Sequence, residues 1–179
     1  MPVTGAQLVV AAFERAGVEV VFGLPGVHNL ALWPALADSP IRLVGVRHEQ
    51  AAAYAADGYA RASGTVGVAL VTTGPGAANT LAAVGEAWAS RSPVVVIATD
   101  VPTTLRREGV HRGLLHEVPD QRAMFGPVTK ATFRVEDAAN LRSRVTEALA
   151  AAIAAPSRPV LVEVPTDLLS AEVAGGSAE

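Results

Sequence analysis

The sequence predicts an α/β fold in which a doubly wound, mostly parallel sheet carries helices on both faces. Five short runs of Val, Ile and Leu alternate along the 179 residues with Ala-rich segments of helical length. These runs are apolar almost throughout, which is typical of strands that are covered on both faces. The segments between them are long enough to cross back over a sheet, so successive strands are expected to lie parallel.

The strands are expected where β-branched residues gather between turn signals. Such residues favour a pleated, buried backbone. The five predicted strands cover residues 18–22, 41–46, 66–72, 94–99 and 160–164.

Helices are expected between these strands. Thr4 and Gln7 have the spacing of a capping box, and Gly17 is placed to end the helix that follows. Gly64 and Pro156 are further stop signals. The predicted helices cover residues 4–16, 30–37, 49–63, 77–90 and 138–155.

Two segments do not follow this alternation. Residues 103–124 carry charges and glycines and are predicted to form a long excursion with one short helix, and long loops of this kind are often functional. The segment from residue 171 to 179 contains Gly175, Gly176 and Ser177 and is predicted to be a linker-like tail. Residues 1–170 are therefore expected to form one domain.

The composition narrows the class of partner. The chain has a net charge of −3 and no cluster of Lys and Arg, so neither nucleic acid nor an anionic membrane is an expected partner. It has no cysteine, which excludes disulfides and thiolate metal sites. The N-terminus lacks a basic region followed by an apolar run, and no apolar segment approaches the ~20 residues that span a bilayer. We expect a cytoplasmic protein.

Glu49 is the first candidate for chemistry. It follows the second predicted strand and opens the third helix, at the sheet edge where ligands bind in open α/β folds. The alanines that follow it leave the acid on a nearly featureless apolar wall, where it could share a proton with a basic ring nitrogen. Alternatively, Glu49 is an ordinary first-turn acid that the helix dipole favours.

Two turns that contain Gly and Pro follow predicted strands in the same manner. Gly-Leu-Pro-Gly occupies residues 23–26, and Thr-Thr-Gly-Pro-Gly occupies residues 72–76. Glycines there allow a ligand to approach bare backbone, although tight turns alone also require them. Neither turn matches a phosphate-binding motif, so no phosphate is assigned to them. Asn79 could bind a ligand or cap a helix.

The four histidines do not have the spacing of metal ligands, and no metal site is predicted in this chain. We interpret His28, His48 and His111 as structural residues. His116 is the exception, because it lies in the excursion next to Glu117.

Five ordered motifs, between about residues 4 and 169, belong together. They are Phe-Gly-Leu-Pro-Gly at 22–26, Arg-His-Glu-Gln-Ala at 47–51, Asp-Gly-Tyr-Ala-Arg at 57–61, Thr-Gly-Pro-Gly at 73–76 and Ser-Pro-Val at 92–94. With them the chain resembles the N-terminal pyrimidine-binding domain of thiamine diphosphate-dependent enzymes. The similarity is to the acetolactate synthase-like group, which includes 2-oxo acid decarboxylases, oxalyl-CoA decarboxylases and carboligases.

The resemblance implies roles for individual residues. The catalytic glutamate of the family falls on Glu49, which would hydrogen-bond a ring nitrogen of the aminopyrimidine and promote removal of the thiazolium proton. His116 falls where relatives place a residue that faces the substrate, a small 2-oxo acid. The residues that the resemblance places around the cofactor, in addition to Glu49, are Pro25, Gly26, Thr73, Gly76 and Asn79.

The resemblance also implies a partner. Family enzymes bind Mg²⁺ and the diphosphate through a second domain that carries Gly-Asp-Gly and a downstream Asn, and this chain has no such motif. We therefore expect half of a lyase or transferase site, inactive alone and completed by a partner chain or domain, with self-association into a dimer. Alternatives are a non-catalytic oligomerisation or regulatory module, or a domain that binds another planar ligand.

Overall fold

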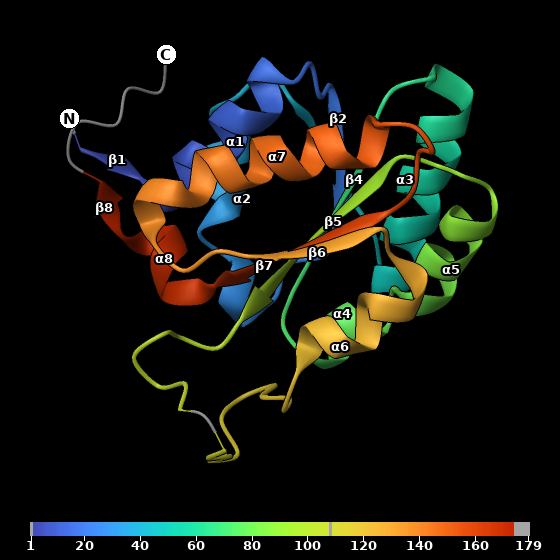
Figure 1. Ribbon diagram of the computed structural model, residues 1–179. Helices are drawn as coiled ribbons and strands as arrows, with labels where there is room; N and C mark the ends of the chain where they lie inside the picture. The colour runs from blue at the N-terminus through green and yellow to red at the C-terminus, as the bar shows by residue number, and fades with distance from the viewer. Residues whose placement is uncertain (1, 108, 174–179) are drawn as a thin grey trace.

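Six parallel strands form the central sheet. The computed structural model describes residues 2–107 and 109–173, and Figure 1 shows this sheet with helices on both sides. In chain order the strands are β2 (Val20–Gly23), β3 (Arg42–Gly45), β4 (Gly67–Val71), β5 (Val94–Asp100), β6 (Ala131–Arg134) and β7 (Val160–Pro165). Their order in the sheet is β3-β2-β4-β5-β7-β6. The predicted α/β fold with a parallel sheet is confirmed.

Each face of the sheet is covered by its own layer of helices. Neighbouring residues of a strand alternate between the layers, so Val21 contacts the first layer while Val20 and Phe22 contact the second. The first layer contains α1 (Gly5–Arg15), α2 (Leu32–Ala37), α7 (Leu141–Ile153) and α8 (Thr166–Ser170), and the second contains α3 (Glu49–Ser63), α5 (Leu81–Ala89) and α6 (Gln121–Phe125).

The second layer packs unusually close to the sheet because its buried residues are small. Ala52, Ala53 and Ala56 of α3 are buried against the strands. A Cβ placed on Gly67 of β4 would lie 2.0 Å from the carbonyl oxygen of Ala56, so only glycine fits at this crossing. This contact fixes the position of α3, and therefore of Glu49 at its first turn.

The predicted helix boundaries are correct where the end signals are local. Thr4 accepts from the Gln7 amide at 3.3 Å and donates its own amide to the Gln7 side chain at 2.9 Å, which is the predicted capping box. Helix α3 has the predicted bounds and ends at Gly64, whose φ of 72° favours glycine.

Two helices differ from the prediction. The helix expected over 77–90 is divided into α4 (Pro75–Ala78) and α5, because the Thr80 hydroxyl bonds to the Ala77 carbonyl at 2.7 Å and competes with helical hydrogen bonds. The last predicted helix begins with a 3-10 turn, η3 (Ala138–Asn140), before α7.

Strand β6 was not predicted. Its residues, Ala-Thr-Phe-Arg, contain no Val, Ile or Leu, so it lacks the apolar run that marks the five other strands of this sheet. The predicted excursion ends at α6 and a 3-10 turn, η2 (Gly126–Val128). Figure 1 shows the segment between β5 and α6 as a long loop that extends beyond the sheet.

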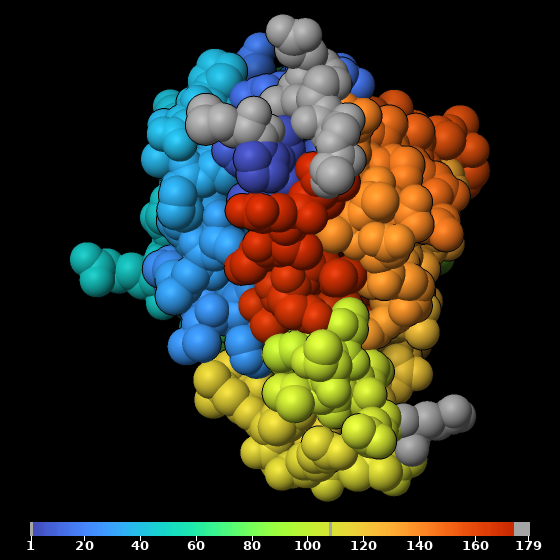
Figure 2. Space-filling model, turned by 90° about the vertical axis from the view of Figure 1, so that its left-hand side faces the viewer, coloured from blue at the N-terminus to red at the C-terminus, as the bar shows by residue number. Residues whose placement is uncertain are grey.

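The two ends of the described chain meet. Strand β1 (Val3–Thr4) pairs antiparallel with β8 (Glu172–Val173), and the Gly5 amide donates to the Ala171 carbonyl at 3.0 Å. Figure 2 shows the N-terminal residues in dark blue beside the C-terminal segment in red. The segment predicted as a linker-like tail therefore begins in a paired strand, and residues 174–179 lie outside the described residues.

The strand order reverses between β2 and β4. From β2 the chain moves to β3 on one side and then returns to β4 on the other. In open α/β sheets, ligands bind at the carboxyl ends of strands where the order reverses in this way. Both Gly-Pro turns follow these two strands. No helix within the described part of the chain combines the length and apolar character needed to cross a membrane.

Candidate functional site

Glu49 lies at the carboxyl edge of the sheet, on the first turn of α3. Its side chain is half-buried, and its Oε2 accepts a hydrogen bond from the Asn79 side-chain amide at 2.9 Å. Asn79 directly follows α4, so the acid of one strand–helix connection meets the amide of the next. The structure therefore brings together two of the predicted site residues that are 30 positions apart.

The two Gly-Pro turns meet on the side chain of Thr72. A Cβ on Gly26 would lie 2.5 Å from the Thr72 Cβ, and a Cβ on Gly76 would lie 2.6 Å from the Thr72 Cγ2. The same Cβ on Gly76 would lie 3.3 Å from Oε1 of Glu49. Bare backbone at Gly76 thus lies beside the acid, and a side chain at either glycine would have to displace Thr72. Pro25 is exposed at the same edge.

Thr73 has a different position from its neighbours. Its side chain is fully buried, and its hydroxyl lies 2.7 Å from Nδ1 of His28 and 3.1 Å from the hydroxyl of Thr99. These bonds join the turn after β4 to the turn after β2 and to β5. His28, which the sequence led us to interpret as structural, is therefore part of the predicted site region. Its place directly after the first Gly-Pro turn was the signal that could have marked it.

His116, which belongs to the excursion over residues 103–124, also lies at the carboxyl edge of the sheet. Its ring centroid lies 6.2 Å from that of His28, in an edge-to-face arrangement. Its backbone has a φ of 61°, and its carbonyl lies against Gly74, where an added Cβ would be 2.2 Å away. Burial lowers the pKa of His28, and the neighbouring His116 lowers it further, against the opposing effect of Asp100.

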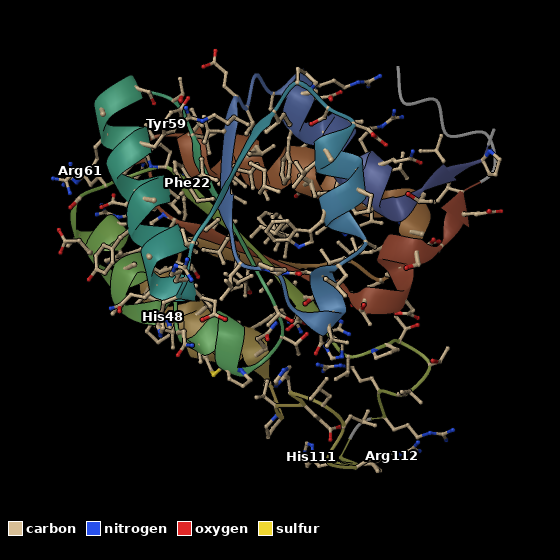
Figure 3. All side chains as sticks on the ribbon, turned by 180° about the vertical axis from the view of Figure 1, so that it is seen from behind. Phe22, His48, Tyr59, Arg61, His111 and Arg112 are labelled. Atoms are coloured by element: carbon tan, nitrogen blue, oxygen red, sulfur yellow. The ribbon has the colours of Figure 1, made fainter. Side chains whose placement is uncertain are left out.

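His111 is not brought to this edge. Figure 3 shows His111 and Arg112 at the tip of the excursion, away from the sheet, whereas His48 lies at the start of α3. A cavity of about 220 Å³ lies beneath that tip, and its lining includes Arg106, His111 and Glu117. This cavity contains none of the residues predicted to bind the cofactor.

A buried ionic cluster, which we define as Asp100, Arg106, Arg134 and Glu163, lies further along the same edge. Arg134 donates to Asp100 at 2.8 Å and also pairs with Glu163, while Arg106 pairs with Asp100. Burial raises the pKa of Glu163, and Asp100 reinforces this, against Arg134 and Arg106. The cluster was not predicted from the sequence, although Glu163 within the apolar run 160–164 was a visible signal.

Within residues 2–107 and 109–173, no group of three or more His, Cys, Asp or Glu side chains lies so as to hold a metal ion. The Glu49 edge instead combines one carboxylate, one amide and bare backbone. Such an arrangement can hold a flat polar ring by hydrogen bonding and close packing.

Comparison with known proteins agrees with this geometry. A family model described as "Thiamine pyrophosphate enzyme, N-terminal TPP binding domain" matches residues 3–124, which is more than half of the chain. The chain belongs to this family.

Its relatives include several enzymes. The chain is 42% identical over 171 residues to the probable 2-ketoarginine decarboxylase AruI of Pseudomonas aeruginosa, covering 96% of this chain and 30% of that protein. It is 37% identical to the probable acetolactate synthase large subunit of Methanocaldococcus jannaschii, covering 94% and 28%. It is 38% identical to 2-hydroxyacyl-CoA lyase 2 of Mus musculus, covering 92% and 25%. The chain thus spans less than a third of the length of these relatives.

Proposed function

We propose that residues 1–170 form the pyrimidine-binding half of a thiamine diphosphate-dependent decarboxylase or carboligase that acts on 2-oxo acids. One observation carries the proposal. The Glu49 carboxylate is half-buried at the carboxyl edge where the strand order reverses, with Oε2 bonded by Asn79 and Oε1 beside the bare backbone of Gly76. An acid oriented in this way is suited to a ring nitrogen.

The residues of this edge fit an aminopyrimidine ring. Gly26 and Gly76 present backbone without side chains, and Thr72 fills the space between them. The Thr72 hydroxyl is a buried polar atom without a hydrogen-bond partner among the described residues, as expected of a wall that a polar ligand completes.

The roles of the protein residues follow from their contacts. When bound, thiamine diphosphate supplies a thiazolium carbon that acts as a nucleophile toward the carbonyl of a 2-oxo acid. Glu49 would hold or release a proton at the ring nitrogen, and Asn79 would keep its carboxylate in one orientation. Thr73, bonded to His28, would hold the second turn, and Pro25 would pack near the ring.

His116 is the proposed substrate-facing residue. Its side chain lies beside His28 at the carboxyl edge, and a neutral or protonated imidazole can bond a carboxylate or exchange a proton. Both imidazoles would then face the 2-oxo acid.

The diphosphate and Mg²⁺ would be held by a second domain or chain. The relatives are more than three times as long as the matched region, which leaves room for such a domain in them. We further propose that the site is completed on association, and that this domain also pairs with a second copy of itself.

Calorimetric titration with thiamine diphosphate and Mg²⁺ tests the divided site. The chain is titrated alone and then with a partner that carries the Gly-Asp-Gly and Asn motif. We expect tight binding only with the partner present. Absence of binding in both cases would favour the non-catalytic module.

Substitution Glu49→Gln tests the mechanism. It removes the proton-transferring acid while keeping size and hydrogen bonding, so turnover by the completed enzyme should fall by at least about 100-fold. The circular dichroism spectrum and melting temperature should stay near those of the unsubstituted chain. Glu86→Gln, which alters an exposed acid of α5, is the matched control and should retain activity. Unchanged turnover of Glu49→Gln would refute the proposed role.

A further inference from the structure

We propose that Gln121 is a positioning residue that holds the turn at Gly74 and, through α4, the orientation of Asn79 toward Glu49. This inference rests on the proposed function, since it gives Gln121 a task in the site where Glu49 acts. Gln121 is the first residue of α6, far from the Gly-Pro turns in sequence, and its side chain is fully buried.

Both the oxygen and the nitrogen of the Gln121 side-chain amide form hydrogen bonds. Its Oε1 accepts from the Gly74 backbone amide at 2.7 Å. Its Nε2 donates to the Thr99 carbonyl at 3.0 Å and to Oε2 of Glu163 at 3.1 Å. The reverse orientation would turn an oxygen toward two acceptors. The Thr99 and Glu163 acceptors therefore determine that Oε1 points at Gly74.

The hydrogen bond from the Gly74 amide to Gln121 affects the site through the backbone conformation of Gly74. Its φ of 57° is one that glycine adopts readily, and it precedes the first turn of α4. The Gly74 carbonyl accepts from the Ala78 amide at 2.8 Å, and the Asn79 amide donates to the Pro75 carbonyl at 2.9 Å. The orientation of Gly74 thus determines where Asn79, the donor to Glu49, is placed.

The Glu163 acceptor, on the other side of Gln121 from Gly74, is held in place by its own ion pairs. Glu163 is 1% exposed and is paired with Arg134, which also bonds Asp100. A buried ionic cluster of this kind is costly to rearrange, since each charge would lose its partner in a medium of low dielectric. It therefore gives Gln121 a fixed support on β7.

The short α4 has few bonds of its own. With four residues it cannot satisfy its first amides internally, and the Gly74 amide is buried where water does not replace Gln121. Removal of the Gln121 oxygen should therefore release this turn first, before the sheet itself is affected.

The test compares three variants of the full chain by NMR. Gln121→Met removes both polar ends at similar volume. Gln121→Glu keeps an oxygen acceptor for Gly74 and, in its protonated form, an O–H donor toward the Thr99 and Glu163 acceptors. Asp120→Ala removes the N-cap bond from Asp120 to the Ala123 amide at 3.0 Å, and so weakens the same helix without touching Gly74.

Two signals are measured, the exchange rate of the Gly74 amide and the side-chain amide resonances of Asn79. In Gln121→Met we expect Gly74 exchange to rise by at least about tenfold, in line with a lost buried hydrogen bond, and the Asn79 resonances to shift. At acidic pH, where the introduced acid is protonated, Gln121→Glu should keep Gly74 within about threefold of the original rate. Asp120→Ala should change neither signal.

Unchanged Gly74 exchange in Gln121→Met, or unmoved Asn79 resonances, would overturn the inference. If Gln121→Met does not fold, loss of Gly74 protection in Gln121→Glu would overturn it instead. Both signals are read without cofactor. Failure of the unsubstituted chain to bind thiamine diphosphate with its partner would therefore refute the proposed function separately. If binding occurs, Gln121→Met should weaken it by about tenfold, while Asp120→Ala should not.

Discussion

Two acidic regions lie along the same edge of the sheet, and they differ in how their charge is compensated. Asp100 and Glu163 are almost completely buried, and both meet the guanidinium of Arg134. Glu49 is half-buried and bonded to the neutral amide of Asn79. A buried acid that is paired within the chain serves the structure, whereas a half-buried acid with one oxygen beside bare backbone is available to a ligand.

The largest expected effect comes from removing the shared cation of the buried region. Arg134→Met removes the close cationic partner of the buried Glu163 and one of the two partners of Asp100, so the free energy of unfolding in urea should fall by about 3–5 kcal/mol. The control is Arg144→Met, which breaks the exposed pair with Glu147 at 2.9 Å and should cost about 0.5 kcal/mol or less. Equal losses in the two variants would contradict the distinction between buried and exposed pairs.

The open region should respond most strongly to filling its bare backbone. Gly76→Val places a side chain where even a Cβ is 2.6 Å from Thr72, so thiamine diphosphate binding to the completed enzyme should be abolished. Overpacking should also cost about 1–3 kcal/mol of stability. Gly85→Ala is the matched control, because its Cβ would meet Val128 at an ordinary 3.8 Å. Normal cofactor affinity in Gly76→Val would refute the placement of the ring.

The pH dependence of the free energy of unfolding gives a third test of the difference between the two acidic regions. Burial and Asp100 raise the pKa of Glu163 above its ordinary 4.5, so the native state binds this proton more tightly than the unfolded chain. That contribution to stability is complete below pH 4.5 and is lost as the pH rises through the native pKa.

Glu163→Gln removes this titration. The free energy of unfolding of the variant, relative to the unsubstituted chain, should therefore increase as the pH rises above 4.5 in a series of denaturant titrations. Glu86→Gln checks that loss of a surface carboxylate does not produce the same trend. A relative stability that falls with pH would contradict the assigned direction.

The smallest effect on stability is expected at the open region itself. Asn79→Ala removes the amide that bonds Glu49, but water can replace it, so the free energy of unfolding should change by about 0.5 kcal/mol or less. Cofactor affinity in the completed enzyme should nevertheless fall several-fold. A loss of stability comparable with that of Arg134→Met would show that the Glu49 region is structural.

The sequence was sufficient for elements whose signals are local. The bounds of α3 follow from its Ala-rich run and the stop at Gly64, and the start of α1 follows from Thr4 and Gln7. It was insufficient for β6, whose partly exposed residues become a strand only by pairing with β7. It also missed the break before α5, because the Thr80 bond competes with a helix that propensity alone would continue.

The candidate site could likewise be predicted only in part. Glu49 and both Gly-Pro turns could be placed at the carboxyl edge from strand order alone, and the structure brings Glu49, Gly76 and Asn79 together. The bonds from His28 to Thr73 and from Gln121 to Gly74 could not be predicted, since they join residues 45 and 47 positions apart.

By itself, the sequence determined the α/β class, because hydrophobic period, helix caps and glycine turns act over a few neighbouring residues, and its ordered motifs indicated the family. Only the tertiary structure decided which acids are paired and which remains open. Burial and charge compensation depend on side chains from separate strands, such as Arg134, Asp100 and Glu163, which become neighbours when the sheet assembles.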